Sequence, residues 1–369
     1  MHRYIGLMSG TSMDAIDCVL VEFSQTLPQV LATSQTPIAE DIRLRLQSLC
    51  QGGGSELDEL AALDHVMGRL FAQEVLQLLA QTAVETRDVR AIGSHGQTIR
   101  HYPPRQGRGN SLQIGDPNLI AALTGICTIA DFRRKDMAVG GQGAPLVPAF
   151  HNAVFRREDK GRVVVNIGGI ANLTILPRDP AAQVTGFDSG PGNLLMDAWI
   201  HRHLGKNLDE DGAWAASGAA HGPLLTALLQ DAYFKNPPPK STGREYFNLE
   251  WLEPLIAAHA PAADPVDIQA TLCELTAQSI SHAIFQHASH CEEVLLCGGG
   301  IHNKYLLQRL STLLAPRTLH STHDFGIAPD FVEAIAFAWL ARQTLEGKPG
   351  NLPSVTGAER AVILGGVYS

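Results

Sequence analysis

Two stretches of alternating apolar and polar positions, each interrupted by a short run of small residues, begin the two halves of the chain. The first covers residues 3–23 and turns at Gly10–Asp14, and the second covers residues 161–177 and turns at Gly168-Gly169. Alternation of period two, with β-branched residues on both sides, predicts a strand before and after each turn. The sequence therefore predicts two β-hairpins that are alike in pattern rather than in identity.

Helical and extended patterns alternate along the rest of the chain. Apolar residues recur every three or four positions in the two longest predicted helices. Helices are predicted at 57–79, 116–124, 194–203, 267–288, 304–314 and 330–345, and further strands at 89–94, 111–114, 125–131, 183–188, 293–297 and 361–364. Residues 205–248 are polar and rich in Gly and Pro, and a loop of this length is expected to be functional or flexible.

Composition narrows the class of protein. A chain of 369 residues predicts two domains, because a typical domain has about 150 residues. A hydrophobic share of 45%, a charged share of 18% and a net charge of −9, with no long Lys/Arg run, are typical of a globular protein that does not bind nucleic acid or an acidic membrane. No apolar run approaches the ~18 residues that span a bilayer, and no signal-peptide pattern opens the chain. The six scattered cysteines, without a CxxC pair, favour reduced thiols in a cytoplasmic protein over a disulfide framework or zinc site.

The turn of the first hairpin has the chemistry of an anion site. It presents the backbone N–H groups of Gly10, Thr11 and Ser12 with two hydroxyls, and such a nest suits a phosphate. No Gly-Lys-Ser/Thr follows, so it is not a Walker A loop. On this turn alone an ordinary hairpin is an equal alternative. The second hairpin favours a nucleotide held between two related domains.

Polar residues also follow several predicted strands, where open α/β sheets place ligand contacts. His95 is a candidate ligand residue, or else a loop histidine bonded to backbone. Asp131 could accept sugar hydroxyls, and Arg133 or Arg134 could pair with a carboxylate, while the alternative is a solvated loop. Asp188 could be a general base or a helix N-cap.

Three glycines, Gly298–Gly300, separate a predicted strand from a predicted helix. They would permit close backbone approach to a flat ligand, for which adenosine is the natural candidate. The alternative is a strained turn alone.

Ten motifs, taken together, resemble the anhydro-N-acetylmuramic acid kinase family over nearly the whole chain. They are GLMSGTSMDAID (6–17), GSHGQT (93–98), ADFR (130–133), GGQGAPL (140–146), VNIGGIANLT (165–174), GFDSGPGN (186–193), STGREYFN (241–248), DIQATLCELTA (267–277), CGGGIHN (297–303) and NLPSVTGA (351–358). Their length and their order make the resemblance specific.

The resemblance implies an α/β protein with two RNase H-like (actin-like ATPase) domains. Each would hold a mixed five-stranded sheet flanked by helices, with the nucleotide in the cleft between the domains. We expect the first domain to comprise residues 1–137 with a tail of about 350–369, and the second residues 138–349. Family members use ATP and Mg²⁺ to open the anhydro ring of anhydro-N-acetylmuramic acid with water and to phosphorylate O6, in peptidoglycan recycling.

The motifs also carry site residues over to this chain. The ATP-binding set is Gly10, Thr11, Ser12, Met13, Asp14, Ala15, Ile16, Asp17, Gly168, Gly169, Gly298, Gly299, Gly300 and Asn303. Asp188 matches the catalytic aspartate, and Glu333 is a weaker candidate for orienting the water, since a first-turn Glu also complements a helix dipole. The candidate sugar contacts are His95, Gln97, Asp131 and Arg134. Ala15 departs from the family, which usually has Gly there, but a methyl is tolerated at a negative φ.

Two other functions stay open on the sequence. One is another hexose or amino-sugar kinase of the same superfamily, which phosphorylates a free hydroxyl without adding water. The other is an ATPase of the actin or chaperone kind that acts on no sugar. The expected partners are ATP and a small sugar, with Mg²⁺ carried on the ATP phosphates and its direct protein ligands unknown. The sequence does not fix the oligomeric state, and a homodimer is one alternative.

Overall fold

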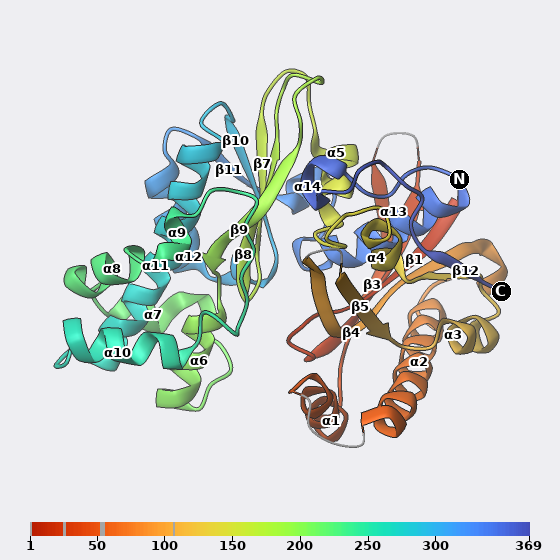
Figure 1. Ribbon diagram of the computed structural model, residues 1–369, viewed down its shortest axis with the longest axis horizontal. Coiled ribbons are helices and arrows are strands. Elements are labelled where there is room, and N and C mark those ends of the chain that lie inside the picture. Colours follow the sequence, from red (N-terminus) through yellow and green to blue (C-terminus); the bar gives the residue numbers. More distant parts are fainter. Residues whose placement is uncertain (1, 25–26, 52–55, 106–107) are drawn as a thin grey trace. The chain divides into compact units, whose positions relative to one another are not determined.

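The computed structural model describes residues 2–24, 27–51, 56–105 and 108–369, and the chain divides into two compact units (Figure 1). The first unit comprises Met1–Val154 and Gly326–Ser369, and the second comprises Phe155–Phe325. These bounds differ from the expected domain boundaries, which lay between residues 137 and 138 and between residues 349 and 350. One reason is that helix α13 (Val332–Leu345), expected in the second domain, packs against strands β1 and β4 of the first unit.

The first unit is built on a mixed sheet of seven strands. They are β1 (His2–Ser9), β2 (Ala15–Phe23), β3 (Pro28–Pro37), β4 (Val89–Arg105), β5 (Arg108–Ile114), β6 (Thr128–Ala130) and β12 (Gly366–Tyr368). The order is β12-β6-β4-β1-β2-β3, with β5 paired to β4. Strands β1, β2 and β3 are antiparallel neighbours, whereas β4 is parallel to β1, and β6 is parallel to β4.

The second unit repeats this core with five strands. They are β7 (Arg162–Ile167), β8 (Ile170–Leu176), β9 (Thr185–Pro191), β10 (Glu293–Cys297) and β11 (Thr318–Ser321), in the order β11-β10-β7-β8-β9. Again the first three are antiparallel, and the last two run parallel to β7. Both predicted hairpins are confirmed as β1–β2 and β7–β8. The twofold mixed α/β architecture that the resemblance implies is confirmed.

Helices flank both sheets. In the first unit they are α1 (Glu40–Gln51), α2 (Glu56–Ala80), α3 (Pro117–Thr124), α4 (Phe132–Met137), α5 (Val147–Phe155, whose last residue falls in the second unit), α13 and α14 (Pro353–Thr356). In the second they are α6 (Leu194–Leu204), α7 (Ala213–Ser217), α8 (Gly222–Leu229), α9 (Ala232–Lys235), α10 (Leu249–His259), α11 (Pro265–His287) and α12 (Lys304–Leu314). Short 3₁₀ turns are η1 (Thr86–Asp88), η2 (Glu210–Gly212), η3 (Gly299–His302), η4 (Thr322–Phe325) and η5 (Pro329–Phe331).

Three expectations about elements were wrong. The first sheet has seven strands rather than five, because β4 continues beyond its parallel pairing with β1 to pair with β5, and β12 pairs with β6. Residues 361–364 form no strand, because Val362 bonds to Asn351 Oδ1 and to the N–H of Gly350 instead. Residues 205–248 are no simple loop, since they form α7, α8 and α9, which are too short to show helical periodicity.

Opposite faces of the first sheet meet different helices. Ile5 and Leu7 of β1 share a buried cluster with Met67 and Phe71 of α2. The intervening Gly6 faces α13, as does Gly93 of β4, since successive residues of a strand point to opposite faces. A Cβ on Gly6 would lie 1.8 Å from the carbonyl oxygen of Ala334, and one on Gly93 would lie 2.0 Å from that of Phe337. The helix can therefore lie directly on the strands only because both residues are glycine.

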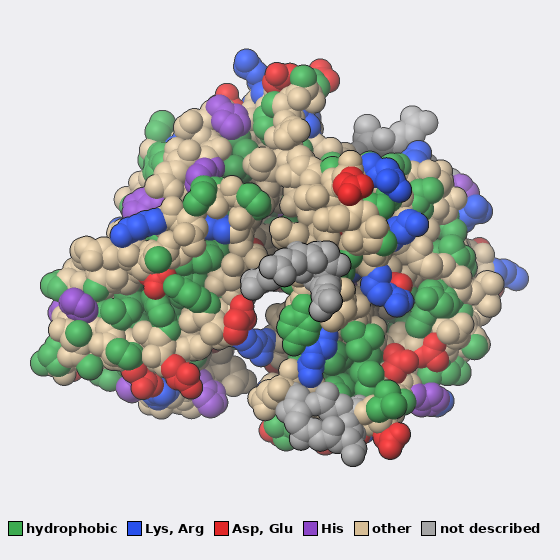
Figure 2. All heavy atoms as spheres, viewed as in Figure 1, with side chains coloured by type: hydrophobic (Ala, Val, Ile, Leu, Met, Phe, Trp, Pro, Cys, Tyr) green, Lys and Arg blue, Asp and Glu red, His purple; other side chains and the backbone are tan. Residues whose placement is uncertain are grey.

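Charged side chains of both signs are interspersed on the face of the molecule drawn in Figure 2. Among the described residues, no helix is both long and apolar enough to cross a membrane.

Substituting Gly93→Ala is expected to destabilise the first unit by about 2–3 kcal/mol or more, because the neighbour is helix backbone that cannot rotate away. Differential scanning calorimetry measures the effect as a lower melting temperature. Gly222→Ala is the matched control, since a Cβ there meets nothing within 4 Å. Equal melting of the Gly93→Ala variant and the wild type would contradict the close approach of α13.

Candidate functional site

The turn of the first hairpin is an exposed loop with one buried anchor. The N–H of Met13 donates to Gly10 O at 3.2 Å, and Met13 has a φ of 60°. Its side chain lies in the core, whereas Thr11 and Ser12 are exposed. Ala15 is the first residue of β2 and is not among the described residues with positive φ, so its methyl group is accommodated as expected.

Gln97 forms hydrogen bonds to two residues at this turn. Its side chain is completely buried: Oε1 accepts from Ser9 Oγ at 2.7 Å, and Nε2 donates to Gly10 O at 3.2 Å. It lies on β4 at the last residue that pairs with β1. Gln97 is thus engaged in fixing the hairpin turn, which the prediction of a sugar contact did not foresee.

His95 is buried next to Arg133 of α4. Arg133 donates to His95 Nε2 from Nε at 3.2 Å and from an Nη at 2.8 Å, while His95 Nδ1 lies 2.8 Å from Gly96 O. A guanidinium can only donate and a carbonyl can only accept, so the proton of the neutral ring is on Nδ1. Burial, with a smaller effect of Arg133, lowers the pKa of His95 to about 3. His95 is therefore neutral and accepts hydrogen bonds from Arg133.

Arg133 of α4 also interacts electrostatically with Glu333 in the first turn of α13. Burial lowers its pKa to about 10, against the opposing effect of Glu333. Burial raises the pKa of Glu333, and Asp17 raises it further while Arg133 lowers it. The Arg133 cation thus opposes the rise in the pKa of the half-buried Glu333 carboxyl. The sequence analysis chose Arg134 rather than Arg133 as a sugar contact. It could not foresee the environment of Arg133, because that depends on the fold.

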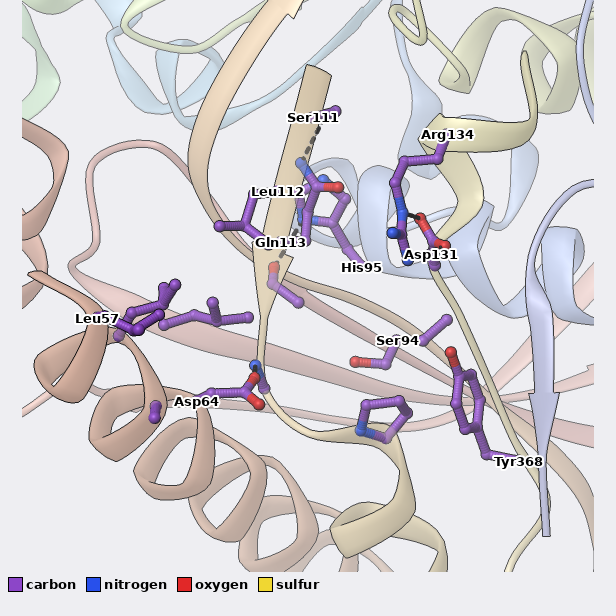
Figure 3. A pocket seen from close by; sticks show the side chains of 17 residues that line it. Leu57, Asp64, Ser94, His95, Ser111, Leu112, Gln113, Asp131, Arg134 and Tyr368 are labelled. Atoms are coloured by element: carbon purple, nitrogen blue, oxygen red, sulfur yellow. Dashed lines mark hydrogen bonds and ion pairs between the residues drawn. The ribbon is translucent and has the colours of Figure 1, made fainter. Parts of the chain in front are cut away.

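A cavity of about 310 Å³ lies in the first unit, lined by residues of α2, β4, β5, α4 and β12 (Figure 3). Asp131 and Arg134 point toward each other at its edge, with contacts of 2.7 and 2.5 Å. Ser94 lines the cavity, and its buried Oγ has no hydrogen-bond partner among the described residues. The predicted residues His95, Asp131 and Arg134 all line this cavity, whereas Gln97 does not.

The turn of the second hairpin is tied to the start of α6. Gly168 O accepts from the N–H of Asn193, and Gly169 O accepts from those of Gly192 and Leu194, at 2.8–3.1 Å. Because a trans peptide directs its N–H opposite to its carbonyl, the N–H of Gly169 points away from this segment. A Cβ on Gly169 would meet nothing nearer than 3.9 Å, so the turn is open around that residue.

Gly298 and Gly300 are required by the fold itself. A Cβ on Gly298 would lie 2.2 Å from Asn166 Oδ1, and one on Gly300 would lie 2.3 Å from Ile167 Cγ2. Gly299 is exposed and has open space around it. The predicted ATP contact Asn303 caps α12, since its Oδ1 accepts from the N–H of Leu306 at 2.9 Å.

Asp188 lies on β9 of the second unit, held by hydrogen bonds to its side chain and main chain. Its Oδ2 accepts from the N–H of Thr242 at 2.9 Å, and no described residue forms a hydrogen bond to Oδ1. Burial raises the pKa of Asp188 to about 6, with Glu245 raising it further and the Thr242 N–H opposing. A carboxyl with a pKa near the working pH suits a general base. The alternative role as an N-cap of α6 does not apply, since Asn193 occupies that position.

Comparisons with known proteins agree over the full length. The family model described as "Anhydro-N-acetylmuramic acid kinase" matches residues 2–369. The anhydro-N-acetylmuramic acid kinase of Coxiella burnetii (strain RSA 493 / Nine Mile phase I) is 52% identical over 367 residues, covering 100% of this chain and 97% of its own length. That of Shewanella loihica is 51% identical (100% and 98%), and that of Saccharophagus degradans is 49% identical (99% and 98%).

Removing the half-buried charge at position 188 is expected to stabilise the protein at neutral pH. The usual carboxyl pKa is 3.8 and the folded value is about 6, so the folded state binds the proton more tightly. The stability gained from protonation is full below pH 3.8 and is lost as the pH rises through 6. Asp188→Asn, which keeps an acceptor for Thr242, should gain about 1–2 kcal/mol at pH 7.5 and almost nothing near pH 4. Thermal melting at both pH values checks this, and a pH-independent difference would contradict it.

Proposed function

Because the chain belongs to the anhydro-N-acetylmuramic acid kinase family, we propose that it opens 1,6-anhydro-N-acetylmuramic acid with water and transfers the γ-phosphoryl group of ATP to O6. The product is N-acetylmuramic acid 6-phosphate, in peptidoglycan recycling. The observation that carries the proposal is Asp188, a half-buried carboxylate with a raised pKa and one oxygen held by a backbone donor.

Asp188 acts as the general base of this reaction. Its carboxylate takes a proton from a water molecule, and the water oxygen attacks C1 of the sugar. The C1–O6 bond breaks, and the departing O6 takes the phosphoryl group from ATP, releasing ADP. A base with a pKa of about 6 is ionised at neutral pH and still basic enough to accept this proton.

The two hairpin turns bind the phosphates. In the first, Gln97 and Ser9 fix the main chain while Thr11 and Ser12 stay exposed. In the second, the N–H of Gly169 points away from its own unit's α6 segment. Catalysis of phosphoryl transfer consists mostly of such positioning and electrostatic stabilisation.

Mg²⁺ would be held by the phosphates of the bound ATP. Within the described ranges, no three His, Cys, Asp or Glu side chains gather as a ready-made metal site. Mg²⁺ commonly binds phosphates with one or two carboxylates, and the exposed Asp14 beside the first turn suits that mode. The ion would supply charge neutralisation to the phosphates.

The cavity of the first unit binds the sugar. Asp131 offers acceptors for hydroxyls, and Arg134 offers donors for the lactyl carboxylate. The Ser94 hydroxyl has no hydrogen-bond partner in the part of the chain that the structure describes. Glu333, kept near Arg133, orients the attacking water. A cytoplasmic location fits the use of ATP and the six free cysteines.

Labelled solvent oxygen separates this reaction from the alternatives. With ¹⁸O-water, the product should carry the label at C1, and ADP release should depend on the anhydro sugar. Phosphorylation without label at C1 would indicate an ordinary hexose kinase. ADP release that the sugar does not stimulate would indicate an ATPase of the actin or chaperone kind.

Asp188→Asn is expected to lower kcat by about 10²–10⁴-fold, because the variant has no base to accept the proton. ATP binding should be unchanged, which calorimetric titration measures. An Asn variant that keeps most of its turnover would remove Asp188 from the role of base.

Arg134→Gln is expected to raise the KM for the sugar about tenfold or more, through loss of a charged hydrogen bond to the carboxylate, with little change in kcat. Arg202→Gln is a control, since Arg202 forms an exposed ion pair with Glu253 in the second unit. Steady-state kinetics at saturating ATP give both parameters. Sugar kinetics like those of the control would place the carboxylate elsewhere.

A further inference from the structure

The segment from Tyr233 to Thr242 touches residue 188 at three separate atoms. The hydroxyl of Tyr233 donates to Asp188 O at 2.7 Å, and the N–H of Asp188 donates to Lys240 O at 3.1 Å. The N–H of Thr242 donates to Asp188 Oδ2 at 2.9 Å. Main chain and carboxylate of residue 188 are thus fixed by one segment, 45 to 54 residues further along the chain.

Lys240 closes this segment on itself. Its ammonium donates to Tyr233 O at 3.1 Å and to Phe234 O at 3.4 Å, and lies 4.7 Å from the centre of the Tyr233 ring. These contacts join the two ends of the segment. Through these contacts, neither the Tyr233 nor the Lys240 side chain touches a reacting atom.

The segment is itself anchored to the second unit. Asp231 Oδ1 accepts from the N–H of Tyr233 at 2.8 Å, and Asp231 Oδ2 accepts from Trp251 Nε1 of α10 at 3.0 Å. The Tyr233 ring packs edge-on against the fully buried Phe247, with centroids 5.4 Å apart. Burial and the charge of Asp188 raise the pKa of Tyr233, so its hydroxyl stays protonated and remains a donor.

We propose that Tyr233 and Lys240 are positioning residues for Asp188. They hold the 233–242 segment against β9, so that the Thr242 N–H keeps one carboxylate oxygen and the other is directed to the attacking water. This inference rests on the proposed function of Asp188 as base. It also assigns a role to the segment that leads into the STGREYFN motif.

The consequence for pH follows from the groups that face Asp188. These are the Thr242 N–H, which lowers its pKa, Glu245, which raises it, and the un-ionised Tyr233. The Lys240 ammonium lies 4.7 Å from the centre of the Tyr233 ring, and its charge adds to burial in lowering the pKa of His287 of α11. Loosening the segment weakens the Thr242 bond, so the acid limb of the kcat–pH profile should move to higher pH.

Tyr233→Phe tests the proposal by deleting a single hydroxyl. We expect kcat to fall about tenfold, with the KM for ATP unchanged and the acid limb shifted upward, because a small misplacement of a catalytic group is costly. Lys240→Met should act in the same direction, and Lys240→Arg should restore most of the loss. Tyr246→Phe is the matched control, since that hydroxyl donates to Asp231 Oδ1 at 2.7 Å in the same aromatic group.

The outcomes separate the two proposals. An unchanged kcat and acid limb in Tyr233→Phe, with Asp188→Asn inactive in the same assay, would overturn the positioning role alone. Equal losses in Tyr233→Phe and Tyr246→Phe, without a shift of the acid limb, would reduce the segment to a structural support and overturn it too. Turnover retained by Asp188→Asn would instead overturn the proposed base.

Discussion

The partial burial of the Asp188 carboxyl group is the constraint on which the rest of the account depends. An ionised carboxylate is expensive to remove from water, and the protein reduces that expense with a single backbone donor, Thr242. The result is a group that stays basic and yet is ionised near neutrality. Stability is given up at a site where reactivity is gained, as is common for functional residues.

Glycine residues let another element approach a strand closely in both units. Gly6 and Gly93 admit α13, which carries Glu333, to the surface of β1 and β4. In the second unit, Gly298 and Gly300 admit the β10–α12 connection to the end of β7. Both units thus use glycine to admit another element close to a strand, and their five-stranded cores share one strand order.

Local sequence patterns were enough to predict the features that depend on residues close together in the chain. Alternation and small turn residues were enough to find both hairpins, and the position of Asp188 at the end of an extended run was enough to make it a candidate. The side chains of Gln97 and Asn303 were found as polar residues in motifs. Their partners could not be predicted, because Gly10 and the α12 N–H groups become available only in the fold. The short helices of 205–248 depend on side-chain bonds to their first turns and on long-range burial rather than on periodicity.

The most direct test of the account is the titration of the Asp188 carboxyl in the wild-type protein, followed by the carbon chemical shift of that group in NMR and assigned with the Asn variant. A midpoint at about 6 is the predicted result, since burial dominates over the single hydrogen bond. A midpoint near the ordinary value of 3.8 would show a solvated carboxylate and contradict the account.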